Sequence, residues 1–68
     1  MTYQKAVFFI SNELFQLNIP KSSHAHAVIY DNAIEACDVL TEKELKEFIA
    51  EWVEYLPHRY FLPNTRLT

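Results

Sequence analysis

The 68-residue chain contains no glycine, although average usage would give about five. Glycine-rich loops that bind the phosphates of nucleotides need a backbone without side chains. The sequence therefore argues against P-loop and dinucleotide-binding enzymes. A turn that needs a positive φ must use asparagine or aspartate here, because these residues are the next most tolerant of that conformation.

Cysteine, long apolar runs and a secretion signal are also scarce or missing. The single cysteine, Cys37, rules out an internal disulfide and fits a reducing compartment. The longest apolar run, residues 6–10, is far shorter than the roughly 20 residues of a membrane span. The N-terminus lacks the ordered basic and apolar segments of a signal peptide. We therefore expect one small domain in the cytoplasm, with no membrane contact.

Basic residues are few in the centre of the chain. Residues 31–54 contain eight carboxylates and two lysines, a net charge of −6, whereas residues 1–30 carry +1 and residues 55–68 carry +2. Nucleic-acid binders concentrate lysine and arginine, so this distribution argues against a nucleic-acid partner. The simpler interpretation of these carboxylates is a solvent-exposed helix face. The alternative is an acidic patch that binds a basic protein.

Residues 42–56 have the clearest secondary-structure pattern, an amphipathic helix. Thr41 and Glu44 fit a capping box, in which each side chain bonds the backbone N–H of the other. Pro57 cannot continue a helix and restricts the residue before it. Apolar residues recur at helical spacing on one face, at Leu45, Phe48, Ile49, Trp52, Val53 and Leu56.

The first part of the chain predicts a β-hairpin. Strands at about residues 4–11 and 14–19 would flank a loop at Asn12-Glu13, and the β-branched and aromatic residues at 7–10 favour strands. Pairing outward from that loop places Phe8 and Ile10 on the inner face. The competing interpretation is a helix whose apolar line contains Val7, Ile10, Leu14 and Leu17.

A second hairpin is predicted from strands at about residues 25–30 and 33–39, with Asp31-Asn32 as the turn. The expected fold is therefore α+β, a four-stranded antiparallel sheet with one C-terminal helix packed across a single face. The apolar tail, residues 57–68, is expected to start back along the helix or pair with a sheet edge, and its last residues are expected to fray.

The predicted register brings four metal-binding residue types to the sheet face away from the helix, namely His24, His26, Glu35 and Cys37. Imidazole and thiolate are good zinc ligands, but these residues are more simply polar groups on a half-solvated sheet. A nucleophilic pair of His26 and Cys37 would need a cleft that so small a domain hardly offers. The sequence predicts neither an enzyme nor a cofactor.

The outer sheet face is the main predicted contact surface. It would expose a contiguous apolar patch of Val7, Phe9, Leu14, Val28, Tyr30 and Val39. The helix would add Glu47, Glu51, Glu54 and Tyr55. Such a patch often marks an interface. The sequence therefore predicts a small protein-binding module, such as a regulator or inhibitor that occupies a larger protein's surface, and the alternative is a homodimer packed through its sheets.

Overall fold

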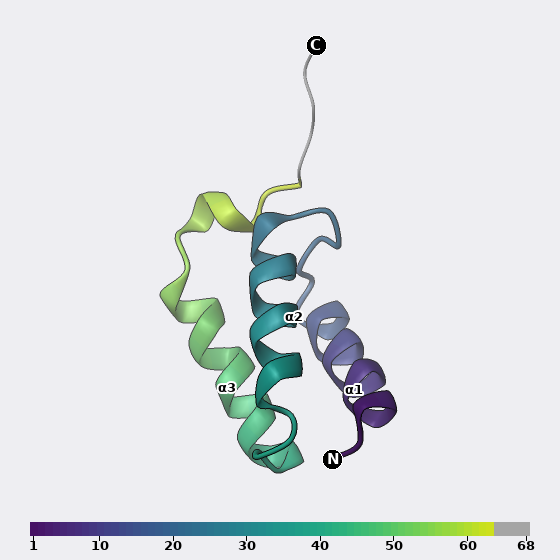
Figure 1. The fold of residues 1–68 in the computed structure, drawn as a ribbon. Helices are drawn as coiled ribbons and strands as arrows, with labels where there is room; N and C mark the ends of the chain where they lie inside the picture. The colour runs from purple at the N-terminus through teal and green to yellow at the C-terminus, as the bar shows by residue number, and fades with distance from the viewer. Residues whose placement is uncertain (64–68) are drawn as a thin grey trace.

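The protein is all-helical in the part of the chain that the computed structural model describes, residues 1–63. The elements are α1 (Tyr3–Gln16), α2 (His24–Ala36), α3 (Glu42–Tyr55) and the short 3-10 helix η1 (His58–Phe61). Helix α2 lies between α1 and α3 (Figure 1). The predicted α+β fold is wrong, because residues 1–63 contain no strand and hence no four-stranded antiparallel sheet.

Helix α1 replaces the first predicted hairpin. The Thr2 hydroxyl caps it by accepting a hydrogen bond of 3.3 Å from the Lys5 N–H. The predicted loop at Asn12-Glu13 lies inside the helix. Its fully buried residues are Ala6, Ile10 and Leu14. This four-residue spacing forms one ridge along the helix. The same residues also fit the two-residue period of a strand, which is why the sequence favoured a hairpin. The competing helical interpretation was therefore the correct one, although the buried line begins at Ala6.

The end of α1 confirms the expectation that asparagine would take a positive-φ position. Asn18 follows the last turn with a φ of 61°. Its N–H bonds the Phe15 carbonyl at 3.0 Å, and the Ile19 N–H bonds the Leu14 carbonyl at 3.1 Å. This pair of bonds is the Schellman motif, which usually uses glycine at the position of Asn18. Both Leu14 and Ile19 are buried, so the motif also closes one end of the core.

Helix α2 replaces the second predicted hairpin. Ser23 caps it, because its hydroxyl accepts a hydrogen bond of 3.1 Å from the His26 N–H. The predicted turn at Asp31-Asn32 lies in the body of the helix. The Asn32 amide donates a 2.7 Å hydrogen bond to the Val28 carbonyl one turn earlier, so a residue typical of turns is satisfied within the helix.

Small side chains let α2 occupy the centre of the fold. It contacts α1, α3 and η1. Ala25, Ile29 and Ala33 are fully buried on it at four-residue spacing, and the two alanines let neighbouring helices approach closely. The buried apolar core consists of Ala6, Ile10, Leu14, Ile19, Ala25, Ile29, Ala33, Cys37, Leu45 and Ile49.

Helix α3 matches the sequence prediction. The capping box is present, with the Thr41 N–H bonding the Glu44 carboxylate at 3.0 Å and the Glu44 N–H bonding the Thr41 hydroxyl at 3.2 Å. The helix ends at Tyr55, immediately before its C-cap residue Leu56. The predicted stripe is buried unevenly: Leu45 and Ile49 are fully buried, but Trp52 is only half-buried.

Substitution of the α3 cap gives a modest, specific expected result. Thr41→Ala removes the hydroxyl that accepts the Glu44 N–H, so it should lower the free energy of unfolding by about 1 kcal/mol. Thr41→Ser retains that acceptor, and serine is at least as good an N-cap residue as threonine, so this variant should stay within about 0.5 kcal/mol of wild type. Urea titration of both variants checks this, and equal losses would show that the hydroxyl contributes nothing.

The start of the tail, residues 57–63, follows neither of the two paths predicted from the sequence. Residues 58–61 form η1, which packs on α2 rather than along α3 or a sheet edge. The Tyr60 ring meets the His24 ring edge-on, with 4.6 Å between centroids. The predicted fraying concerns residues 64–68, which lie outside the described part of the chain. Among residues 1–63, every helix is too short or too polar to cross a membrane.

Candidate functional site

The four candidate metal ligands are spread along α2. His24 is exposed at the first position of the helix, His26 is half-buried two residues later, and Glu35 is exposed near the opposite end. Cys37 is the buried C-cap residue, about 20 Å from His24 at the helical rise of about 1.5 Å per residue. Residues 1–63 contain no group of three or more histidine, cysteine or acidic side chains that could hold a metal ion.

The predicted outer-face residues do not form one surface, because the described residues 1–63 contain no sheet that would align them. Leu14 is fully buried in the core. Val39, in the loop before α3, is 80% exposed. The other members, Val7, Phe9, Val28 and Tyr30, are half-buried at separate places on α1 and α2. The fold therefore removes the apolar patch on which the predicted contact surface depended.

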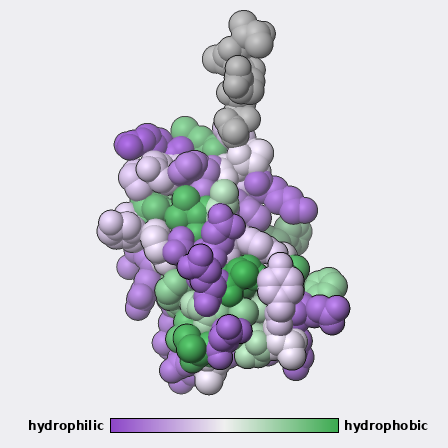
Figure 2. Space-filling view, viewed as in Figure 1, coloured by the Kyte–Doolittle hydropathy of each residue, from purple (hydrophilic) through white to green (hydrophobic). Residues whose placement is uncertain are grey.

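Figure 2 shows the surface that the helical fold presents on one side. Hydrophobic side chains on that face are interspersed with hydrophilic ones rather than gathered in one continuous area. On α1, Phe8 and Phe15 are each 78% exposed. Residues seven positions apart share one side of a helix, so the two rings lie on the same side of α1. The predicted hairpin had placed Phe8 on the inner face, whereas the helix exposes it.

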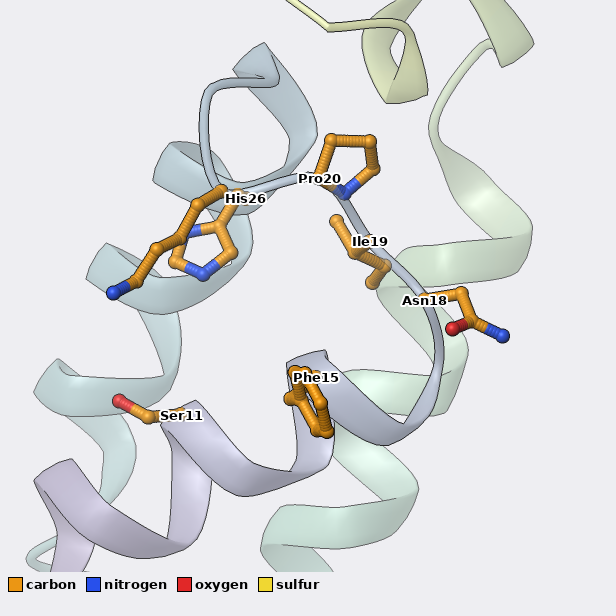
Figure 3. Close-up of a pocket in the computed structure, with 7 residues that line it drawn as sticks. Ser11, Phe15, Asn18, Ile19, Pro20 and His26 are labelled. Carbon is orange, nitrogen blue, oxygen red and sulfur yellow. The ribbon is translucent and has the colours of Figure 1, made fainter.

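A groove of about 460 Å³ opens where the loop after α1 passes α2. Ser11 and Phe15 line it from α1, and His26 lines it from α2 (Figure 3). Asn18, Ile19, Pro20 and Lys21 complete the lining from the connecting loop. The groove thus combines three apolar side chains with a hydroxyl, an amide, one ammonium group and one imidazole. No hydrogen bond joins Ser11 to His26 in the described chain.

The environment of His26 shifts the pKa of its side chain. Partial burial lowers the pKa of its imidazole, and the nearby Lys21 ammonium lowers it further. Its ring also stacks on Tyr30, with 6.1 Å between centroids and 11° between planes. The folded protein therefore favours the neutral imidazole.

The lowered pKa predicts a pH dependence of stability. In the unfolded chain the imidazole titrates near its ordinary value of 6.5, whereas in the folded chain it takes up a proton only at lower pH. The contribution of neutral His26 to the free energy of unfolding is therefore complete above the unfolded-state pKa of 6.5. It is lost as the pH falls from 6.5 toward the lower pKa of the folded state. Between about pH 7.5 and about pH 5, wild type should lose more stability in urea titrations than His26→Gln. Equal losses in the two proteins would contradict this.

The acidic face of α3, which we define as Glu47, Glu51 and Glu54, lies where the sequence predicted it. All three side chains are exposed. Their spacing of three and four residues places them on one side of the helix. Tyr55, four residues after Glu51, is 77% exposed beside them. These four are the predicted contact residues that the structure brings together.

An open hollow of about 480 Å³ adjoins the acidic face and is lined by Glu51, Trp52 and Tyr55. The Trp52 and Tyr55 rings meet at 87°, with 5.6 Å between centroids. The Trp52 ring also contacts the Phe48 ring, with 6.4 Å between centroids and 68° between planes. We call the residues Glu51, Trp52 and Tyr55 the aromatic corner. The sequence predicted Trp52 as a core residue near the middle of the apolar stripe, and the residue spacing gave no sign of this second role.

Comparisons provide no relative from which a role could be transferred. No model of a known protein family, no curated protein and no solved structure matched the chain.

Proposed function

We propose that this chain is a small, non-enzymatic, cytoplasmic protein-binding module that occupies a basic surface of a larger protein through α3, as a regulator or inhibitor. The observation that carries the proposal is the exposed acidic face with the aromatic corner beside it. The predicted outer sheet face has no part in it, because residues 1–63 contain no sheet.

The two parts of this surface suit different tasks in recognition. The carboxylates of Glu47, Glu51 and Glu54 attract a basic partner, speed its association and disfavour acidic competitors. Tryptophan and tyrosine are enriched among the few residues that dominate binding energy at interfaces. Trp52 and Tyr55 provide such a pair next to the charges. Helix α3 thus combines a steering charge with an anchoring group.

A matched pair of triple variants tests this role. Glu47→Gln, Glu51→Gln and Glu54→Gln together neutralise the acidic face. Asp31→Asn, Glu35→Gln and Glu42→Gln remove the same charge from exposed positions elsewhere. In a pull-down from native extract, proteins retained by wild type should be lost with the first variant, kept with the second and released by salt. Equal retention by the two variants would reject the acidic face of α3 as the binding surface.

The alternative is a homodimer, and the exposed phenylalanines favour α1 as its interface. Phe8 and Phe15 lie on one side of α1, where a second copy could pack antiparallel against the first. Sedimentation at micromolar concentration should then give twice the 8.0 kDa of one chain. Phe8→Ser with Phe15→Ser should restore the monomer. A wild-type monomer would remove this alternative and leave the α3 proposal as it stands.

A further inference from the structure

We propose that the aromatic corner binds the guanidinium group of an arginine side chain on the partner protein. This inference rests on the proposed function and specifies its partner chemistry. The hollow is open to solvent and is lined by two aromatic rings and one carboxylate. Cations are attracted to aromatic ring faces, and to tryptophan most strongly. Few other groups would gain from all three side chains at once.

Packing holds one of the two aromatic rings of the corner in place. The Trp52 ring contacts both Phe48 and Tyr55, and the Tyr55 ring stands nearly at a right angle to it. The Trp52 ring is half-buried, so packing restricts its motion, whereas Tyr55 is 77% exposed. A flat cation can therefore lie over one ring face with its edge toward the other ring. A preorganised site loses less conformational entropy on binding than a flexible one.

The surrounding charge selects a cation rather than a neutral apolar group. Glu51 lines the hollow itself, and Glu47 and Glu54 lie on the same side of α3. Lys43 and Lys46 are the basic residues of α3, and neither lines the hollow. An arginine brought near this helix is attracted by the field of the acidic face before it reaches the rings.

Arginine fits this corner better than lysine. Its planar guanidinium can stack on an aromatic face while its N–H groups bond a carboxylate in two places. A lysine ammonium is compact and strongly hydrated, so it gains less from the flat ring surfaces. We therefore expect the corner to distinguish these cations, which a general electrostatic attraction would not do.

The test uses Trp52 as its reporter, because it is the only tryptophan in the chain. The probe is the peptide acetyl-Lys-Ala-Arg-Ala-Lys-amide, and matched peptides carry citrulline or lysine in place of the arginine. Citrulline has nearly the same shape as arginine but no charge. Each peptide is titrated into the full chain while the Trp52 fluorescence and its indole N–H resonance are recorded.

We expect a saturable Trp52 response to the arginine peptide, and roughly tenfold weaker binding when citrulline replaces arginine, a difference of about 1.4 kcal/mol. The lysine peptide should fall between the two. Glu51→Gln should weaken binding of the arginine peptide several-fold, and Tyr55→Ala should do the same without disturbing the core, because Tyr55 is 77% exposed. Glu42→Gln, the same charge change at the other end of α3, should have much less effect.

Two kinds of result would overturn the inference. One is no Trp52 response, or equal affinity for the arginine and citrulline peptides. The other is an equal effect of Glu51→Gln and Glu42→Gln, which would show attraction to overall charge alone. Neither touches the proposed function, which fails separately if neutralising the acidic face leaves protein retention unchanged. The two failures are therefore distinguishable.

Discussion

Leu14→Ala is expected to lower the free energy of unfolding by about 2–5 kcal/mol, the usual cost of emptying a buried leucine site. Leu14 is fully buried on α1 and also anchors the turn that closes this helix. Small domains have only about 5–15 kcal/mol of stability in total. The variant should therefore be largely unfolded at a urea concentration that leaves wild type folded.

Phe8→Ala is the matched control for this result. Phe8 lies on the same helix but is 78% exposed, so its loss should change stability by no more than about 0.5 kcal/mol. A hairpin over these residues would reverse the order, with Phe8 inside and Leu14 outside. If Phe8→Ala is the more damaging change, α1 does not pack on α2 as described.

Asn12→Pro should be comparably severe, with a cost of about 3 kcal/mol or more. Asn12 lies in the interior of α1. Proline there removes one backbone hydrogen bond and its ring collides with the preceding turn. Circular dichroism should show a loss of helix, and urea titration should show the lower stability.

Asn12→Ala separates the effect of proline from the loss of the asparagine side chain. Alanine has the higher helix propensity, so this variant should match wild type or gain up to about 0.7 kcal/mol. In a hairpin loop at Asn12-Glu13, proline would be tolerated better than in a helix and alanine would bring no gain. A stable Asn12→Pro protein would therefore argue against α1.

Helix α3 could be predicted because several local signals agree on it. The box formed by Thr41 and Glu44 fixes its start and Pro57 its end. Between them, the buried Leu45 and Ile49 keep the helical period. Each of these signals depends on neighbouring residues alone, so no knowledge of tertiary packing was needed.

Helices α1 and α2 could not be predicted in the same way, because their local signals conflict with their packing. The β-branched and aromatic residues at 7–10 favour strands locally. The turn residues Asn12 and Asn32 lie inside helices, where Asn32 is satisfied by the Val28 carbonyl. The buried residues at four-residue spacing on each helix are what favour helices over strands in the folded protein. Some of these residues, such as Ala25 and Ala33, are small and only weakly hydrophobic, so they do not stand out in a hydrophobic pattern.

The candidate site was predictable to the extent that it lies on α3. Glu47, Glu51, Glu54 and Tyr55 were placed correctly on the exposed side of that helix. The predicted residues outside α3 were chosen from the register of the predicted hairpins, so their placement on one surface was wrong. One of them, Leu14, is a core residue. The aromatic corner needed the ring geometry of Trp52 and Tyr55, which residue spacing alone does not give.

Every surface described above depends on residues 3–16 and 24–36 being helical, and backbone Cα chemical shifts measure this residue by residue. Helical structure predicts positive secondary shifts that continue without interruption through Asn12-Glu13 and through Asp31-Asn32. Negative shifts on both sides of those pairs, with a break at each pair, would instead show two hairpins. That result would contradict the three-helix fold and the surfaces that it places.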